Sequence, residues 1–132
     1  MKKIYLILLL SLNSLTSYSQ GIRIQATNTS YCKLVGEELV CGEETTDNSI
    51  FVLDATNKEI RRYSNNNNNN TNIFTILSSI RDTTSSGALR LTSKCLSANN
   101  LECTITIISK DNYSLLSIRV EKLVTVFYFD ET

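Results

Sequence analysis

Four cysteines are the residues of this sequence whose type and spacing point most directly to chemistry. They form two close pairs along the chain, Cys32 with Cys41 and Cys95 with Cys103. An even number of cysteines in a small exported chain is typical of disulfides, whereas metal sites and redox centres usually carry C-x-x-C pairs. Because neither pair has that spacing, we expect two disulfides, no metal ion and no cofactor.

The first pair is symmetric about Gly36-Glu37, a two-residue turn in which Gly at the first position favours type II′. In that register Cys32 faces Cys41 as a non-hydrogen-bonded pair, with Cα atoms about 4.5 Å apart. This separation is within the reach of a disulfide. The spacing therefore predicts a β-hairpin closed by a Cys32–Cys41 bridge.

The second pair is symmetric about Asn99, which predicts a three-residue loop with Asn100 in the left-handed conformation. Cys95 then faces Cys103 across the hairpin. Chain entropy alone favours a crossed link such as Cys32 to Cys103, worth about 4.4 kcal/mol against about 2.7 kcal/mol for each local pair. We expect the local bridges because the turns bring those thiols together, and the crossed pairings are the alternative.

Acidic residues offer a further candidate site. Glu43, Glu44 and Asp47 form an acidic loop that, with Asp130 and Glu131, could hold Ca²⁺ or act as paired carboxylates. The loop lacks the Asp-x-Asp spacing of a calcium-binding loop. We therefore interpret it as a solvated turn and expect no metal ion and no catalytic residue there.

Arg61 and Arg62 are neighbours in a predicted strand, so their side chains lie on opposite faces. One of them could line the concave side of a barrel and meet an anionic ligand, and the alternative is a solvated or ion-paired surface residue. Core packing accounts for most of the aromatic side chains, with a ligand-lining role for one or two of them. These aromatic residues are Tyr31, Tyr63, Tyr113, Tyr128, Phe51, Phe74, Phe127 and Phe129.

The composition excludes several classes of function. The chain has 132 residues, with 13 Lys+Arg, 13 Asp+Glu and no His. Without His there is no imidazole base, no His-containing triad and no His metal ligand. A net charge near zero also lacks the basic surface that nucleic acid binding requires. We therefore expect a protein that is not an enzyme and does not bind nucleic acid.

The first 19 residues have the pattern of a signal peptide. Lys2 and Lys3 precede an apolar run over residues 4–10, and Ser17-Tyr18-Ser19 matches a small-x-small cleavage site. The run is much shorter than the roughly 20 apolar residues that cross a bilayer. We expect cleavage after Ser19, a secreted or periplasmic mature chain over residues 20–132, and no membrane insertion after cleavage.

The elements that must position these residues are strands. Residues of alternating polarity and β-branched or aromatic type occur over residues 51–54, 60–63, 73–77, 89–95, 104–107, 116–120 and 124–129. Eight to ten short strands joined by tight turns predict an antiparallel meander that closes into a small barrel or half-barrel, with a two-layer β-sandwich as the alternative. We expect one domain with a flexible Asn-rich loop at residues 64–72, and any helical turn near residues 71–79.

In general plan the mature chain resembles the small secreted bacterial β-meander proteins with calycin-like barrels. It shares a strand-turn-strand over residues 50–60 and a cysteine pair before the final strands, while the lipocalin Gly-x-Trp signature is absent. Locally, Ser86-Gly87-Ala88 before a strand is similar to the Ser-Gly motif of the periplasmic C-type lysozyme inhibitors. The Tyr that follows that motif and the matching Lys-Gly loop are missing. The first resemblance implies a barrel, and the second implies enzyme inhibition.

Together these features predict a non-catalytic binding domain whose partner is an unknown small molecule or protein. A small-molecule binder should present an apolar pocket or a groove with convergent polar groups. The alternative is a protein-interaction or enzyme-inhibitor module, which should present a protruding loop or an exposed apolar patch. The candidate loops are residues 83–87 and 43–49, and we expect a monomer.

Overall fold

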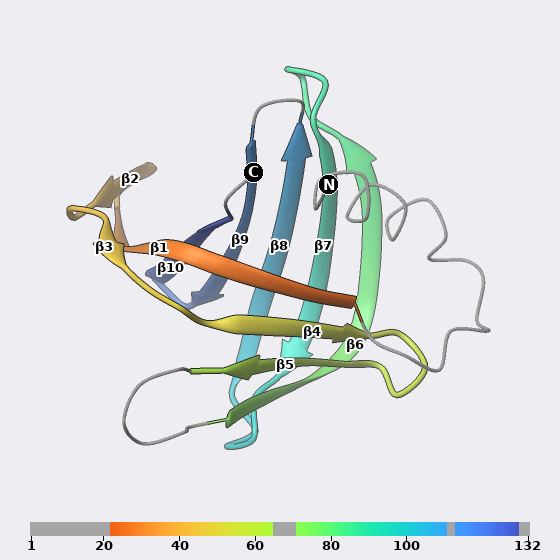
Figure 1. Ribbon diagram of the computed structural model, residues 1–132. Helices are drawn as coiled ribbons and strands as arrows, with labels where there is room; N and C mark the ends of the chain where they lie inside the picture. Colours follow the sequence, from red (N-terminus) through yellow and green to blue (C-terminus); the bar gives the residue numbers. More distant parts are fainter. Residues whose placement is uncertain (1–21, 65–70, 111–112, 130–132) are drawn as a thin grey trace.

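The computed structural model describes residues 22–64, 71–110 and 113–129, which form strands joined mostly by short turns (Figure 1). These ranges contain ten strands and no helix. The strands are β1 (Ile22–Val35), β2 (Glu38–Cys41), β3 (Thr45–Thr46), β4 (Ile50–Asp54), β5 (Glu59–Tyr63), β6 (Thr71–Thr83), β7 (Leu89–Leu96), β8 (Glu102–Lys110), β9 (Tyr113–Val120) and β10 (Leu123–Phe129). The predicted all-β class is confirmed, while the predicted signal peptide lies outside the described residues.

Eight of the strands form a closed antiparallel barrel. Along the sheet the order is β1, β4, β5, β6, β7, β8, β9 and β10, and β10 pairs back onto β1 from Ala26↔Phe129 to Lys33↔Leu123. The first and last described strands therefore lie side by side, although they come from opposite ends of the chain (Figure 1). Closure removes the exposed edges of the sheet, and the barrel rather than the sandwich is confirmed.

The longest strand, β1, pairs with three other strands along one edge. Residues 22–25 pair with β4, residues 28–29 with β3 and residues 32–35 with β2, while the opposite edge pairs with β10. A register shift between Ala26 and Asn28 bends the strand where its partner changes. This arrangement places β2 and β3 beside the barrel rather than within its closed wall.

The strand β6 corrects one prediction. Residues 71–79 were the segment in which any helical turn was expected, but the first part of β6 pairs with β5 and the second part pairs with β7. Both ladders satisfy backbone groups over a segment rich in Thr and Ile, so tertiary pairing outweighs the irregular local pattern. Thr71 and Asn72 are already paired in β6, and residues 65–70 of the predicted loop lie outside the described residues.

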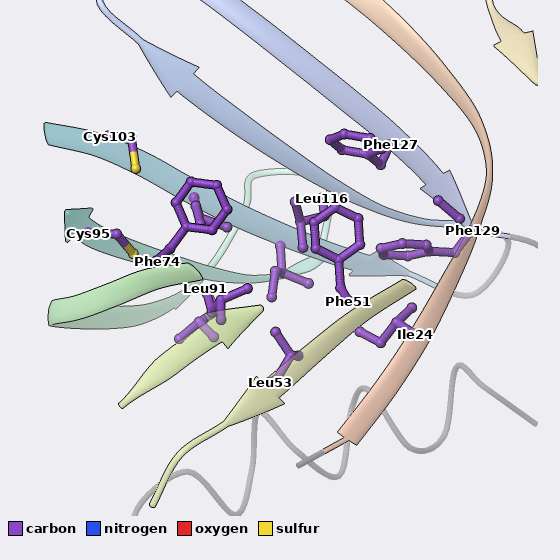
Figure 2. Packing of buried hydrophobic residues seen from close by; sticks show 14 residues of the cluster. Ile24, Phe51, Leu53, Phe74, Leu91, Cys95, Cys103, Leu116, Phe127 and Phe129 are labelled. Atoms are coloured by element: carbon purple, nitrogen blue, oxygen red, sulfur yellow. The ribbon is translucent and has the colours of Figure 1, made fainter. Parts of the chain in front are cut away.

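The barrel interior is filled by side chains that alternate inward from all eight strands (Figure 2). Phe51 lies at its centre, with its ring centroid 4.9 Å from Phe127 and 6.3 Å from Phe129 in edge-to-face geometry. The predicted core role of the aromatic residues holds for the four phenylalanines, whereas Tyr31, Tyr63 and Tyr113 are exposed. The cluster consists of Ile24, Ala26, Phe51, Leu53, Ile60, Phe74, Leu91, Cys95, Cys103, Ile105, Ile107, Leu116, Phe127 and Phe129.

Candidate binding site at the mouth of the barrel

The first cysteine pair forms the predicted disulfide. Cys32 and Cys41 are cross-strand partners with a Cα–Cα distance of 4.0 Å and are joined by a disulfide bond. Gly36 has a φ of 66°, as the predicted turn requires. Cys32 is buried against Val124 and Val126 in a small second cluster, so the bridge fixes the hairpin to the outside of β10.

The second cysteine pair has the predicted register but not the predicted bridge. Cys95 faces Cys103, and Asn100 has a left-handed φ of 63°. Both residues are buried free thiols, and the Cys95 Sγ lies 3.8 Å from the Ser93 carbonyl oxygen that accepts its hydrogen bond. Burial raises the pKa of Cys95 to about 12 and also raises that of Cys103. Since the thiolate is the reactive species, burial opposes oxidation of this pair.

Of the two neighbouring arginines, Arg62 is the one that faces the barrel interior. It pairs across β4 and β5 with the fully buried Phe51, and its guanidinium carbon lies 5.0 Å from the centroid of the Phe127 ring. Arg61 points to the other face, where its NH2 lies 3.2 Å from Asp54 Oδ2. Arg62 thus lies on the inward face and also forms an ion pair with Asp47, whereas Arg61 is ion-paired on the outer face.

The partners of Arg61 show why it belongs to the scaffold. Asp54 is buried at the end of β4 and accepts hydrogen bonds from the backbone N–H and side chain of Asn57. These bonds, together with the charge of Arg61, lower the pKa of the Asp54 carboxyl group. The carboxylate therefore holds together the turn between β4 and β5, and Arg61 contributes to that turn.

Arg62 is held by a polar network from the segment between β3 and β4. Its Nε donates to Ser49 Oγ at 3.0 Å, and its NH2 lies 3.8 Å from Asp47 Oδ2. Ser49 is fully buried, and its own hydroxyl donates to Asp47 at 3.0 Å. A third contact runs from Arg62 NH1 to Asn72 Oδ1 at 3.5 Å. The guanidinium is thus held in place by three side chains of the chain itself.

A cavity of about 330 Å³ opens beside this network, at the end of the barrel formed by β1, β3 and the end of β5. We call this end the mouth. The mouth offers hydroxyl and amide groups together with one guanidinium and one carboxylate among its described lining residues. These residues are Thr29, Tyr31, Thr45, Thr46, Asp47, Asn48, Arg62 and Ser64. Such a lining can hydrogen-bond a small polar molecule from several sides.

The acidic loop does not bring together a metal site in the described part of the chain. Asp47 is bound to Ser49, and Glu44 Oε1 accepts a hydrogen bond from Asn28 Nδ2 at 3.3 Å. Asp130 and Glu131, the other members of this candidate acidic site, lie outside the described residues. Within residues 22–64, 71–110 and 113–129, no three His, Cys, Asp or Glu side chains are placed to hold a metal ion.

The two loops that were expected to protrude have different roles. Residues 43–49 border the mouth through Thr45, Thr46 and Asp47. The loop at residues 83–87 is closed on itself, because Thr84 Oγ1 contacts Ser86 Oγ at 3.0 Å and accepts the Ala88 N–H at 3.0 Å. This second loop is therefore an ordered hairpin turn.

Sequence reasoning missed the residues that hold Arg62 in place. Ser49 carried no motif, Asn72 was assigned to the Asn-rich loop, and Asp47 was interpreted as part of a solvated acidic turn. One local signal was present, since Asp47 accepts the Ser49 N–H at 3.1 Å in the Asx-turn pattern that an Asp-x-Ser sequence favours. The link from that turn to Arg62 depends on strand pairing between β4 and β5, which local sequence does not reveal.

Comparison with known proteins does not assign this chain to a family, so its class is defined by its fold. No protein-family model matches this chain, and no curated protein matches it at a significant level. The class is therefore that of closed eight-stranded antiparallel β-barrels, here with a disulfide-linked hairpin beside the barrel wall. In the described part of the chain, no helix is long and apolar enough to span a membrane.

Proposed function

We propose that this protein is an exported, non-catalytic binding domain that holds a small organic anion at the mouth of the barrel. The observation that carries the proposal is Arg62, an inward-facing guanidinium ordered by Ser49 and Asp47 beside a cavity of about 330 Å³. That volume is at the small end of the range for ligand sites. Guanidinium groups are well suited to carboxylate and phosphate groups, since they donate in a planar fork.

The charges of the mouth narrow the ligand class. Asp47 lies within 3.8 Å of Arg62, so the pair is nearly neutral and a dense polyanion would meet repulsion. A ligand with one anionic group and several hydroxyl groups fits better, because its anion pairs with Arg62 while a hydroxyl donates to Asp47. Tyr31 supplies a further hydroxyl group on the same wall, while the Thr29 hydroxyl donates to the Val126 carbonyl oxygen at 3.0 Å. A sugar acid has this chemistry.

The lining supports binding rather than catalysis. General acid–base hydrolysis by carboxylates requires two acids that converge on the reacting bond. Among the described lining residues, Asp47 is the one carboxylate. The Cys32–Cys41 disulfide supports an oxidising environment, consistent with export to the periplasm or the medium.

The experiment is titration of the protein with glucuronate, followed by calorimetry and by amide chemical shifts. We expect shifts at Thr29, Tyr31 and Asn48, and a loss of at least about tenfold in affinity in the Arg62→Gln variant. Arg61→Gln is the matched control, because it removes the neighbouring guanidinium from the opposite face. Equal affinity of wild type and Arg62→Gln, or equal binding of uncharged glucose, would contradict the proposal.

A second candidate function, a protein-interaction module, is favoured by an apolar patch on the disulfide-linked hairpin. Tyr31, Val35, Val40 and Leu123 are 67%, 59%, 54% and 62% exposed. They surround Lys33 on one face, since Lys33 pairs with both Val40 and Leu123 and the other two residues are two positions away in β1. A rigid exposed apolar face of this kind is typical of an interaction surface.

This second candidate function would use the hairpin as its surface rather than the two candidate loops expected from sequence. The test is affinity capture from the native medium with wild type and with a Val35→Ser, Val40→Ser double variant. A partner retained in equimolar amount by the wild type and lost by the variant supports this function. Retention by both proteins would remove the patch as its basis, and unchanged melting of the variant is the control for folding.

A further inference from the structure

The strand β2 is paired along one edge and open along the other. Among the described strands its one neighbour is β1, with which it pairs from Cys32↔Cys41 to Val35↔Glu38. All four residues of β2 are exposed, and the strand lies apart from the barrel wall (Figure 1). We call the unpaired side of β2 the open edge. An edge of this kind can accept another strand.

The backbone groups on the open edge follow from the hydrogen-bond pattern of the hairpin. The Gly42 N–H donates to the Tyr31 carbonyl oxygen at 3.0 Å, so these two facing residues form a hydrogen-bonded pair. Because hydrogen-bonded and non-hydrogen-bonded pairs alternate, Cys41 and Leu39 lie at non-hydrogen-bonded positions. Their N–H and C=O groups therefore point away from β1. In the described part of the chain these backbone groups have no partner.

Apolar side chains stand on both faces of β2 beside the open edge. Leu39 and Val40 are 47% and 54% exposed and, as neighbours in a strand, point to opposite faces. The Cys32–Cys41 disulfide holds β2 against β1, and Cys32 is buried in the small cluster on β10. An added strand could therefore cover apolar side chains on both faces without first ordering the hairpin.

Glutamates bracket the open edge at both ends. Glu37 and Glu38 precede its two apolar residues, and Glu43 and Glu44 follow them. Glu44 accepts a hydrogen bond from an asparagine of β1, and within the described residues none of the four forms an ion pair. Lys33 is the single cation in residues 32–44. The open edge is therefore negatively charged.

These charges decide between a second copy of the chain and a different partner. Two copies of β2 paired antiparallel about Val40 would place Glu37 of one copy opposite Glu43 of the other, and like charges at facing positions are destabilising. A segment with basic residues at its ends would instead meet glutamates at both ends of the open edge. The charges therefore favour a basic strand from another polypeptide over self-association.

We propose that β2 accepts an extended, basic segment of another polypeptide as an added strand. The backbone of the partner bonds to Leu39 and Cys41, its apolar side chains lie beside Leu39 and Val40, and its basic residues face the glutamates. This inference rests on the second candidate function above, for which it names the class of partner and the manner of binding. It is separate from the anion site, because no residue of β2 lines the mouth.

The test uses a capped peptide of about seven residues, with alternating threonine and valine and a lysine at each end, which is long enough to span the open edge. The matched probe carries a glutamate at each end. We expect saturable binding of the lysine peptide by calorimetry, and slower hydrogen exchange at the N–H groups of Leu39 and Cys41 but not of Val40, which already bonds to β1. The glutamate peptide should bind at least about tenfold more weakly.

Substitution of Leu39 separates the backbone contribution from that of the side chain. Leu39→Pro removes an N–H that faces the open edge rather than β1, whereas Leu39→Ala removes the leucine side chain and keeps that N–H. We expect Leu39→Pro to bind the lysine peptide at least about tenfold more weakly than Leu39→Ala. Melting curves verify that both variants fold, and the exchange measurement on wild type does not depend on either of them.

Four outcomes would overturn the inference. They are equal binding of the two peptides, unchanged exchange at both amides of the open edge, equal affinity of Leu39→Pro and Leu39→Ala, or a dimer in solution that Leu39→Pro abolishes. Arg62→Gln should leave peptide binding unchanged, which separates this inference from the proposed function at the mouth. A partner captured through the apolar patch, without peptide binding at β2, would retain the second candidate function and reject the added strand.

Discussion

The two cysteine hairpins have nearly the same spacing in sequence but different chemistry in the fold. The hairpin of β1 and β2 lies beside the barrel, every residue of β2 is exposed, and Cys32 is bonded to Cys41. The hairpin of β7 and β8 is part of the barrel wall, and Cys95 and Cys103 point into the core as thiols. The difference shows that symmetry about a turn predicts which residues face each other, but not whether they bond.

Turn length explains part of the difference. A two-residue turn places Cys32 and Cys41 at a non-hydrogen-bonded position, where facing side chains are closest, and their Cα atoms are 4.0 Å apart. In the other hairpin the Ser97 N–H donates to the Leu101 carbonyl oxygen at 2.9 Å, so the pair next to the three-residue loop is a hydrogen-bonded pair. By alternation Cys95 and Cys103 are then also a hydrogen-bonded pair, whose Cα atoms are about 5.5 Å apart and whose side chains lie farther from each other.

The largest loss of stability should come from a charge placed at the buried cysteine of the β7–β8 hairpin. Cys95→Asp puts a carboxyl group into a position that is 1% exposed, so we expect the free energy of unfolding at pH 7 to fall by about 3 kcal/mol or more. Val40→Asp is the matched control, because that side chain is 54% exposed and the change should be within about 0.5 kcal/mol. Urea unfolding measures both, and similar losses would contradict the assigned burial.

Loss of the disulfide should give the second largest effect. Replacing both Cys32 and Cys41 by Ala opens the hairpin loop in the unfolded chain, and we expect the free energy of unfolding to fall by about 2.7 kcal/mol. Reductant should lower wild-type stability by a similar amount and leave the double variant unchanged. A Cys95→Ala, Cys103→Ala variant should keep the full sensitivity to reductant. If that sensitivity were halved, the second pair would be a disulfide in solution.

The buried thiols should make stability depend on alkaline pH. The pKa of Cys95 rises from 9.0 to about 12 on folding, so above pH 9 the folded state binds more protons than the unfolded state. The stabilisation is fully present below pH 9 and is lost as the pH rises towards 12. At pH 10 we expect a loss of about 1 kcal/mol from this thiol. Urea unfolding at pH 8 and 10 measures it, and Cys95→Ala should show a smaller difference between the two pH values than wild type.

Much of the fold was predictable because it depends on local pattern. Alternating side chains predicted most of the barrel strands, and Gly36 and Asn100 predicted both turns, since each has the positive φ that its turn demands. Closure of the barrel followed from the number of sequential strands and the cost of exposed edges. The strand β3 was missed because two Thr residues paired to β1 leave no periodic signal.

Only part of the mouth could be predicted from the sequence, because its remaining contacts depend on long-range strand pairing. Strand geometry requires Arg61 and Arg62 to face opposite sides, but which side is the interior depends on the register that places Arg62 opposite Phe51. Likewise, the partners of Arg62 come from a segment 13 residues earlier, at Ser49. Long-range pairing of this kind is decided by packing of the whole barrel and leaves no mark in the spacing of the residues themselves.

The smallest change in the free energy of unfolding should come from substitution of Asn100, whose left-handed conformation allows the turn between β7 and β8. This substitution tests the geometry of the turn without changing either cysteine. Asn100 has a φ of 63°, which Asn tolerates, so Asn100→Gly relieves little strain and adds entropy to the unfolded chain, with a net change within about 0.5 kcal/mol. By comparison, Gly36→Ala adds a Cβ that meets no atom within 4 Å, so its cost of about 1 kcal/mol is backbone strain at φ 66° alone. Urea unfolding under reducing conditions compares the two turns without the disulfide. A larger loss at Asn100 than at Gly36 would show that the barrel-wall turn depends on contacts of the Asn side chain rather than on backbone conformation.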